Sequence, residues 1–295
     1  MISPEVLKKI KRVHIKTSRM AANIFAGQYK SVFKGRGLEF YEVREYLVGD
    51  DIRSIDWNIT ARTGTLHIKK HVEERELTIM LLLDVSRSGW FGSVHSLKKE
   101  IAAEISAVLA SSANKNNDKV GLIIFTDKIE KFIPPRKGKH HILRIIREAL
   151  YFKPQGRCTD IALALEYLNR VTNRSCIAFV VSDFYSKEMK TRLTLASKRH
   201  DIIAVRLTDP RDSELPDAGV LSLNDPESGR KYLVDSSKRS VREAYKNNAD
   251  KRTKELNTLF NLTGIDAIDV STSRPYVEAL VQFFKRRRMR KAMKA

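Results

Sequence analysis

The stretch Leu81–Gly89, which reads LLLDVSRSG, decides how the rest of this chain is interpreted. Its apolar first part is typical of a strand buried in a parallel sheet. The strand ends abruptly in one carboxylate, Asp84, which is followed by hydroxyls at alternate positions, Ser86 and Ser88. Polar groups at the carboxyl end of a strand lie in the crevice where open α/β sheets bind ligands. Oxygen donors without His or Cys favour a hard cation such as Mg²⁺, so we expect a metal site on an α/β sheet.

The chain after residue 78 alternates between strand and helix patterns, which predicts a doubly wound, mostly parallel α/β sheet. Expected strands cover residues 78–85, 120–125, 176–182, 202–207 and 265–270, with an edge strand at 128–133 that ends in two prolines and a hairpin near 221 and 232–234. Expected helices cover residues 96–113, 141–151, a segment from 159 onward, 187–198, 239–262 and 276–288. An N-terminal helix is expected to start at Ser3, with Pro4 at its first position.

Two later segments supply further oxygen donors at the same edge of the predicted sheet. Thr159 stands at or near the start of a helix that follows a loop. Asp183 comes directly after the apolar run 176–182, just as Asp84 follows its own strand. Because the carboxyl ends of parallel strands share one edge, these side chains can surround one cation together with Ser86 and Ser88, and waters would complete its shell.

This three-part arrangement resembles the metal-ion-dependent adhesion site of the von Willebrand factor A domain. That site has the pattern Asp-x-Ser-x-Ser, then a Thr that opens a helix, then an Asp after a later strand. The resemblance implies that Mg²⁺, or alternatively Mn²⁺ or Ca²⁺, is held by Asp84, Ser86, Ser88, Thr159 and Asp183 and accepts a carboxylate from a partner protein.

Two residues depart from the usual pattern of that site. Cys158 stands where a Gly is common, and we interpret it as a small space-filling thiol, with a redox switch as the alternative. Arg87 places a cation inside the Asp-x-Ser-x-Ser loop, where it repels a metal unless its side chain points outward or pairs with an acid. Arg87 is therefore a candidate for binding an anionic partner.

Residues 35–76 resemble the hallmark segment of a bacterial family, domain of unknown function 58 (DUF58). The matching motifs are GRGLEF at 35–40, REY at 44–46, GDDIR at 49–53, IDW at 55–57 and ARTG at 61–64. In that family an A domain follows the segment directly, and relatives are often encoded beside AAA ATPases of the MoxR group. The resemblance therefore implies such an ATPase as a partner.

The role of this segment stays open between two interpretations. In the functional interpretation it is a docking surface for the ATPase or a client, with Arg44, Arg53, Asp56 and Trp57 as contact residues. In the structural one its charges form an internal salt-bridge network, and the aromatic side chains anchor it on the sheet. The anchoring set would be Phe40, Tyr46 and Trp57.

The formal net charge of +20 is concentrated at the two ends of the chain. Residues 1–36 carry +8 and residues 285–295 carry +7, which leaves +5 for the body between them. Basic ends suit an anionic membrane surface or nucleic acid, and solvated helix faces are the plainer alternative. No helix-turn-helix, zinc-finger or RNA-binding motif is present, so we expect no specific nucleic-acid binding and allow weak contact with a membrane surface.

The sequence also argues against several classes of protein. The two cysteines suggest no disulfide framework, the apolar runs are too short to span a bilayer, and no secretion signal is evident. We therefore expect a cytoplasmic protein, with a peripheral position at the inner membrane as the alternative. A phosphotransferase of the Asp-nucleophile kind needs a second Asp where Ser86 stands, and phosphate loops and nucleophile elbows are missing, so we expect no enzyme.

We expect three parts in the chain. Residues 1–76 form a basic helix and the hallmark segment, residues 77–288 form a von Willebrand factor A-like domain, and residues 289–295 form a basic tail. The expected function is a metal-dependent protein–protein interaction module, an adaptor or chaperone component that works with a MoxR-type ATPase, a client that offers an acidic residue, or both.

Overall fold

The computed structural model of the chain describes residues 42–52, 55–70, 76–94, 96–186, 188–225, 227 and 229–292. The expected N-terminal helix, the basic cluster before residue 37, Phe40 and Arg53 lie outside the described residues.

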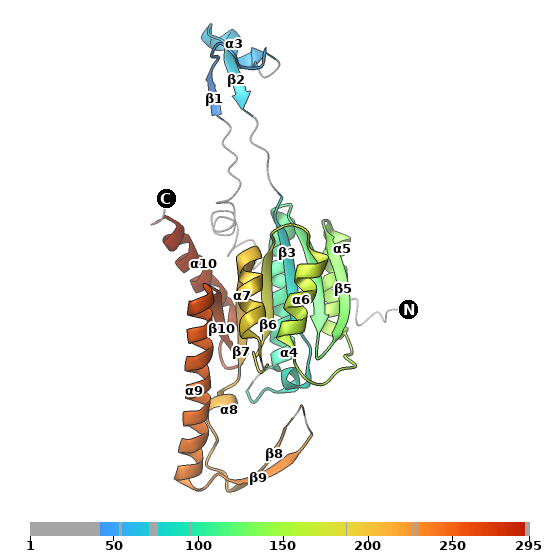
Figure 1. The fold of residues 1–295 in the computed structure, drawn as a ribbon, viewed down its shortest axis with the longest axis vertical. Helices are drawn as coiled ribbons and strands as arrows, with labels where there is room; N and C mark the ends of the chain where they lie inside the picture. The colour runs from blue at the N-terminus through green and yellow to red at the C-terminus, as the bar shows by residue number, and fades with distance from the viewer. Residues whose placement is uncertain are drawn as a thin grey trace.

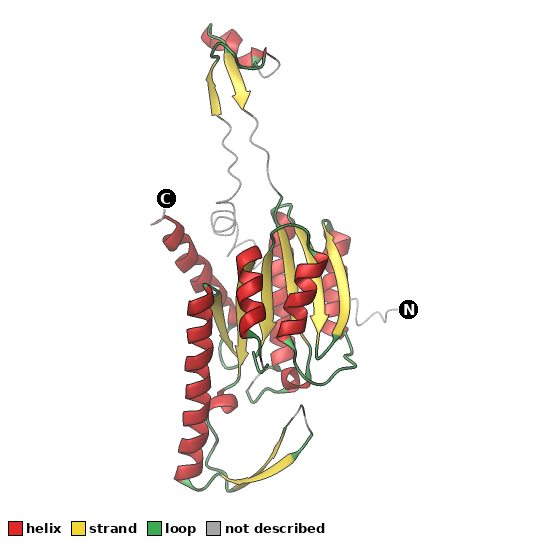
Figure 2. Ribbon diagram, in the orientation of Figure 1, coloured by secondary structure: helices red, strands yellow, loops and turns green. Residues whose placement is uncertain are grey.

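The elements follow one another in the alternating order expected from the sequence (Figures 1 and 2). The strands are β1 (Glu42–Glu45), β2 (His67–Lys70), β3 (Thr78–Asp84), β4 (Lys119–Phe125), β5 (Ile129–Arg136), β6 (Ile177–Ser182), β7 (Asp201–Thr208), β8 (Val220–Asn224), β9 (Lys231–Asp235) and β10 (Asp266–Ser271). The helices are α3 (Trp57–Thr63), the 3₁₀ turn η3 (Arg87–Trp90), α4 (Lys98–Lys115), α5 (Lys139–Tyr151), α6 (Ile161–Val171), α7 (Lys190–Arg199), α8 (Pro210–Ser213), α9 (Arg239–Thr263) and α10 (Tyr276–Ala292).

Six strands form the central sheet in the order β10-β7-β6-β3-β4-β5. All neighbouring pairs are parallel except β4 and β5, so β5 is an antiparallel edge strand. Its two prolines are tolerated there because an edge strand has one side without a pairing partner. The strand order reverses at β3, and β6 pairs on its other side. The predicted doubly wound, mostly parallel α/β class is confirmed by this sheet.

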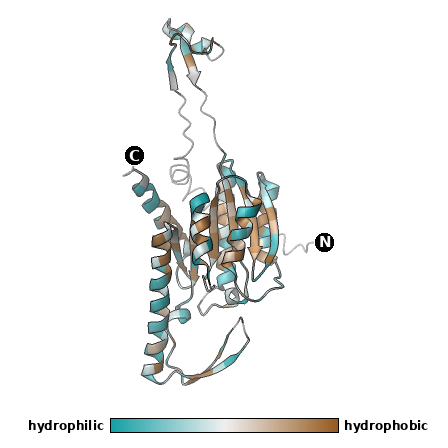
Figure 3. Ribbon diagram, viewed as in Figure 1, coloured by the Kyte–Doolittle hydropathy of each residue, from teal (hydrophilic) through white to brown (hydrophobic). Residues whose placement is uncertain are grey.

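Helices cover both faces of the sheet, and successive side chains of β3 supply both cores. Ile79, Leu81 and Leu83 pack with residues of α4, α5 and α10. Met80 and Leu82 point to the opposite face and pack with residues of α6, α7 and α9. This alternation follows from the two-residue period of a strand. Figure 3 shows the resulting hydrophobic sheet strands beneath helices with hydrophilic outer faces.

The layered arrangement brings the ends of β3 and β6 together. The two strands pair in parallel, with Leu83 opposite Val181, so Asp84 and Ser182 end neighbouring strands at the same edge. The strand order reverses at β3, which has β4 on one side and β6 on the other, and such a reversal leaves a crevice at this edge of the sheet. The fold therefore places the donor groups expected from the sequence at one topological switch point.

The described part of the hallmark segment forms a small unit of its own. β1 and β2 pair antiparallel, and α3 lies between them in the chain. Asp56 is the N-cap of α3 and accepts hydrogen bonds from the backbone N–H groups of Asn58 and Ile59 at 3.0 and 3.3 Å. Gly64 ends the helix in the left-handed conformation, as its φ of 76° shows.

The last helix continues past Arg288, where the sequence pattern ended it, as far as Ala292. Four residues of the expected basic tail are therefore helical. Among the described helices, none combines the length and the apolar character needed to cross a membrane.

Candidate metal centre

Asp84 ends β3 and is buried at the base of the crevice. One carboxylate oxygen accepts the backbone N–H of Ser86 at 2.9 Å, and the other accepts the Ser182 hydroxyl at 2.5 Å. The Ser182 hydroxyl in turn accepts the backbone N–H of Phe184 at 3.0 Å. These bonds fix the orientation of the carboxylate. Ser182 was not among the donors expected from the sequence, although its place directly before Asp183 at a strand end was a usable signal.

Three hydroxyls from two distant segments meet beside Asp84. The Thr159 hydroxyl donates to the Ser86 hydroxyl at 2.8 Å, and the hydroxyls of Ser86 and Ser88 lie 3.0 Å apart. Ser86 and Ser88 come from the turn after β3, whereas Thr159 comes from the loop before α6, 73 residues later. The predicted juxtaposition of Asp84, Ser86, Ser88 and Thr159 is thus present in the structure.

Asp183 completes the set from the end of β6, where it is buried and accepts the backbone N–H of Tyr185 at 3.2 Å. Its charge acts directly on Asp84. Burial, followed by repulsion from Asp183, raises the pKa of Asp84 from 3.8 to about 6. Two carboxylates in one crevice therefore carry more negative charge than the protein neutralises around Asp84, which is an environment that attracts a cation.

Lys98 is a buried cation at the same edge of the sheet and was not expected there from the sequence. Its side chain is only 3% exposed, and its ammonium group lies 2.7 Å from Asp212 and 3.5 Å from Asp183. Burial acts to lower the pKa of Lys98, but the charges of Asp183 and Asp212 outweigh it and raise that pKa. A lysine at the start of an amphipathic helix gives no signal in sequence, because most such lysines are solvated.

The loop that presents Thr159 is organised by Glu130 on β5. One oxygen of Glu130 accepts the Thr126 hydroxyl at 2.9 Å and the backbone N–H groups of Gln155 and Gly156 at 3.0 and 2.7 Å. Gly156 is required for this close approach, because a Cβ there would lie 2.1 Å from side-chain oxygens of Thr126 and its neighbour. The loop is therefore pinned just before Thr159.

The oxygen chemistry of the donor set suits a hard cation. Adjacent oxygens around Mg²⁺, each about 2.1 Å from the ion, are about 3 Å apart. The hydroxyl separations of 2.8 and 3.0 Å match that spacing. A hollow of about 10 Å³ is lined by Asp84, Ser88, Lys98 and Asp183 among others, which is close to the space that one water-sized occupant needs. Among the described residues, no three His, Cys, Asp or Glu side chains converge on one point, so a cation here would depend on the hydroxyls and on waters.

The two residues that depart from the expected pattern, Arg87 and Cys158, lie in different environments. The Arg87 side chain is exposed, while its backbone N–H donates to the Arg157 carbonyl at 3.1 Å and so ties η3 to the Thr159 loop. Burial and the nearby acidic residues, Glu227 first among them, raise the pKa of the Cys158 thiol. A raised pKa keeps the thiol protonated and disfavours reactivity.

The residues proposed for partner contact in the hallmark segment have different environments. Arg44 pairs with Asp50 at 2.6 Å, as in the salt-bridge interpretation. Asp56 is buried and occupied as a helix cap. Trp57 is 66% exposed, so the expectation that it anchors the segment on the sheet is wrong, because the short helix α3 buries none of its side chains.

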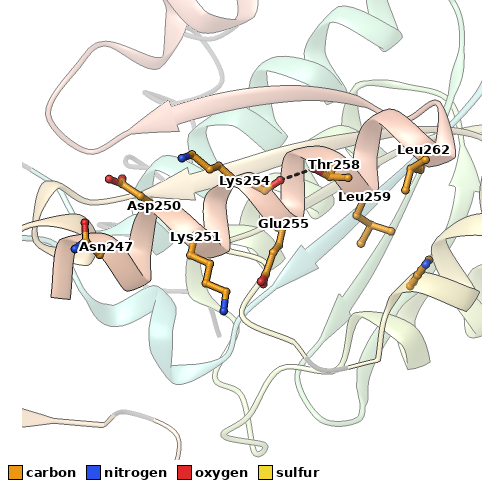
Figure 4. Close-up of a pocket in the computed structure, with 9 residues that line it drawn as sticks. Asn247, Asp250, Lys251, Lys254, Glu255, Thr258, Leu259 and Leu262 are labelled. Carbon is orange, nitrogen blue, oxygen red and sulfur yellow. Dashed lines mark hydrogen bonds between the residues drawn. The ribbon is translucent and has the colours of Figure 1, made fainter. Parts of the chain in front are cut away.

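A larger and more open groove runs along α9, away from the metal centre (Figure 4). Its volume is about 670 Å³, and its lining alternates in charge: Lys190, Asn247, Asp250, Lys251, Lys254, Glu255, Thr258, Leu259 and Leu262. The Thr258 hydroxyl donates to the Lys254 carbonyl at 2.8 Å within the helix. Mixed charge and an open shape give this groove no evident preference for one ligand.

The family described as "Protein of unknown function DUF58" matches residues 42–255, which is most of the chain. The chain belongs to the DUF58 family. The matched range includes residues 42–76 of the hallmark segment and all the candidate metal-centre residues of this DUF58 chain.

Curated relatives match all or part of the DUF58 chain. The protein Rv1480 of Mycobacterium tuberculosis is 28% identical over 290 residues, which are 97% of this chain and 90% of that protein. YeaD of Bacillus subtilis is 26% identical over 176 residues, which are 60% of this chain and 41% of that protein.

Solved structures with some likeness to the DUF58 chain include BatB from Bacteroides thetaiotaomicron, at 17% identity and a TM-score of 0.45 over 72% of this chain and 98% of that one. Another is the SpRpn10 VWA domain, at 11% identity and a TM-score of 0.38 over 70% of this chain and 94% of that one. The α/β class of this chain follows from its own strand order.

Proposed function

We propose that this chain is a metal-dependent protein–protein interaction module. The observation that supports this function is the meeting of Asp84, Ser86, Ser88, Thr159 and Asp183 at the switch point of the sheet, with hydroxyl spacings that suit Mg²⁺. Mg²⁺ bound by two carboxylates and hydroxyls keeps positive charge and open positions. A carboxylate from another protein can then make a charge-assisted contact there.

The proposal is for binding and not for catalysis. Ser86 stands where a phosphotransferase of the Asp-nucleophile kind would carry its second Asp, and its own hydroxyl already accepts the Thr159 hydroxyl and lies beside that of Ser88. A serine hydroxyl is a poor general acid at neutral pH. The proposed partner is a MoxR-type AAA ATPase, a client protein with an acidic residue, or both, as the DUF58 resemblance implies.

The test compares the binding of Asp84→Ala and of wild type to the purified MoxR-type ATPase of the same organism. Binding is measured by biolayer interferometry, once with about 5 mM Mg²⁺ and once with EDTA. We expect binding to need Mg²⁺ and to be lost in Asp84→Ala while the fold is kept, as circular dichroism would show.

Asp217→Ala is the matched control, because Asp217 is 64% exposed and pairs only with Arg242 among the ion pairs of the described residues. It should bind as wild type does. Equal binding by Asp84→Ala and wild type, or binding unaffected by EDTA, contradicts the proposed function.

A further inference from the structure

The β8–β9 hairpin is a sheet of two strands that pairs with no other strand among the described residues. In Figure 1 it is the orange arm that lies away from the central sheet. Its residue pairs follow in unbroken register, from Val220 opposite Asp235 to Asn224 opposite Lys231. A lone two-stranded hairpin is only marginally stable in water, whereas a sheet of three or more strands can be stable by itself. Further strands at its edges would therefore stabilise the hairpin.

The outer edge of β9 carries backbone groups that no described strand pairs. At the base of the hairpin, the Ser236 N–H donates to the Gly219 carbonyl at 2.8 Å. Hydrogen-bonded and non-hydrogen-bonded pairs alternate in an antiparallel ladder, so every second residue back along β9, Val234 and then Tyr232, directs its N–H and C=O toward β8. The residues between them direct these groups toward the free edge: Lys231, Leu233 and Asp235.

This edge lacks the features that block pairing at the β5 edge of the central sheet. β5 carries Pro134 and Pro135, and its register with β4 shifts at two places. Prolines and bulges prevent an edge strand from adding another strand. β9 has neither, and Leu233 at its middle is 79% exposed. The edge of β9 is therefore accessible to another strand.

The sequence of β9, KYLVD, is complementary to itself when two copies run antiparallel about Leu233. Lys231 of each copy then lies opposite Asp235 of the other, and Tyr232 lies opposite Val234. Opposite charges and aromatic–β-branched pairs are favourable cross-strand neighbours. The backbone allows this register, because the residues whose N–H and C=O groups face the free edge pair with one another. A shift by two residues would place Lys231 opposite Leu233 and lose both charge pairs.

The edge of β8 offers a poorer match. Two β8 strands paired about Ser222 would place Val220 opposite Asn224, and the strand contains no charged residue. A β8 edge paired with a β9 edge is a heterologous contact, which does not close in a dimer. Two β9 strands form an isologous contact, which closes with two-fold symmetry. Charge and symmetry therefore both favour pairing through β9.

Asp235 also has local contacts. Its carboxylate accepts the Ser237 hydroxyl at 2.5 Å and lies 3.5 Å from the Lys238 ammonium group. A solvent-exposed ion pair of this kind adds little stability. An ionised carboxylate has two oxygens and about four acceptor positions. Asp235 can therefore keep the Ser237 contact and still accept Lys231 of a second copy.

We propose that the outer edge of β9 is an interface between two copies of this chain, which pair as antiparallel strands about Leu233 into one four-stranded sheet. Leu233 of both copies lies at the centre of the interface, and a Lys231–Asp235 pair lies at each end. The pairing depends neither on the metal centre nor on the proposed function. The interface is small, so we expect a reversible dimer in the micromolar range.

The test measures the oligomeric state of the purified full-length protein by sedimentation velocity, at concentrations up to about 100 µM, where a micromolar dimer is populated. Leu233→Pro removes an N–H that faces the free edge of β9 and keeps the hydrogen bonds between β8 and β9. Ser222→Pro is the matched control, because Ser222 lies opposite Leu233 and its N–H faces the edge of β8. We expect Leu233→Pro to be monomeric and Ser222→Pro to form dimers as wild type does.

Charge reversal distinguishes pairing through β9 from a general loss of the hairpin. Lys231→Glu places two carboxylates opposite one another at each end of the interface, so it should weaken the dimer about 10-fold. Asp235→Lys should weaken it as well, through two pairs of ammonium groups and the loss of the Ser237 contact. The double variant Lys231→Glu/Asp235→Lys restores opposite charges at both ends, so it should form dimers more tightly than either single variant.

A wild type that stays monomeric over this concentration range overturns the inference, as does a dimer that Leu233→Pro leaves intact. Loss of the dimer in Ser222→Pro alone would place the contact at β8 and overturn it too. If both proline variants are monomeric, the charge variants decide. Recovery of the dimer in the double variant supports pairing through β9, and the absence of recovery contradicts it.

Discussion

At the scale of single residues, the candidate metal centre is a set of buried charges with an unequal balance. Asp84 and Asp183 repel one another. Of these two carboxylates, Lys98 pairs with Asp183 alone, and it lies closer still to a third carboxylate, Asp212. Lys98 thus neutralises part of the charge at Asp183 and leaves Asp84 without a cationic partner in the ion pairs of the described residues. The cost of keeping Asp84 ionised is therefore a measurable property of the metal-free protein.

Asp84→Asn tests this cost through the pH dependence of stability. The folded-state pKa of Asp84, about 6, lies above the ordinary value of 3.8, so the folded state binds its proton more tightly than the unfolded state does. The stabilising contribution of Asp84 is complete below about pH 4 and is lost as the pH rises through 6. A shift of about two units corresponds to about 3 kcal/mol.

We therefore expect Asp84→Asn, in EDTA, to gain stability relative to wild type as the pH rises from 4.5 to 7.5, by up to about 3 kcal/mol. Urea unfolding at several pH values measures this difference. Adding Mg²⁺ should reverse the gain at pH 7.5, because the cation binds the ionised carboxylate of the wild type. A difference that stays constant with pH would show that burial does not shift the Asp84 pKa.

At the scale of elements, the centre depends on a loop that a neighbouring strand holds in place. One carboxylate oxygen of Glu130 on β5 accepts three hydrogen bonds. They link Thr126, just after β4, to Gln155 and Gly156 in the loop before α6. Thr159 follows this loop directly, so its hydroxyl reaches Ser86 only while the loop keeps its course.

Glu130→Ala should lower the affinity for Mn²⁺ by about 10-fold, although Glu130 is not itself a donor to the centre. The reason is that the loop would lose its anchor and Thr159 would no longer be held beside Ser86. Isothermal titration calorimetry with Mn²⁺ measures the change. Glu166→Ala on α6 is the control, since Glu166 forms an exposed pair with Arg192 at 3.3 Å and should have no effect. Equal Mn²⁺ affinities of the two variants would show that Glu130 does not support the centre.

At the scale of the whole molecule, α10 joins the C-terminal charge to the core. Its apolar face, with Leu280, Phe283 and Phe284, packs on the sheet. Arg287 turns inward and pairs with Asp201 on β7 and with Asp266 on β10. Arg288 is exposed. The basic end of the chain therefore contains both a structural cation and solvated ones, and a deletion from residue 285 onward would remove both kinds.

Adjacent alanine substitutions separate the two kinds of charge. Arg287→Ala should lower the free energy of unfolding by about 1–3 kcal/mol, because it removes the ion-pair partner of the partly buried Asp201 and leaves Asp266 with Arg290 alone. Arg288→Ala should change it by less than about 0.5 kcal/mol. Urea unfolding measures both. The alternative of membrane-surface contact is tested by reversing the charge of the exposed residues Lys285, Arg286 and Arg288, which leaves the structural cation Arg287 in place. The measurement is binding to anionic vesicles at varied salt concentration. Similar stability losses for the two alanine variants would contradict this division.

Most of the fold was predictable from the sequence because it depends on local patterns. Apolar runs such as the one before Asp84 and the alternation with amphipathic helices predicted the strands and the parallel class of the sheet, and the paired strands confirm that class. The oxygen donors Asp84, Ser86 and Ser88 were visible because they lie within five residues. Thr159 and Asp183 could be added because strand and helix ends share an edge in such a sheet.

What only the tertiary structure decided are the contacts between segments far apart in the chain. Lys98 meets Asp183 across 85 residues, and Glu130 pins a loop 26 residues away. Each of these charged residues looks like an ordinary surface residue in sequence, because charge pattern alone does not show which side chains the fold buries. The sequence thus determined the sheet and the donors at its edge, and packing determined which charges surround them.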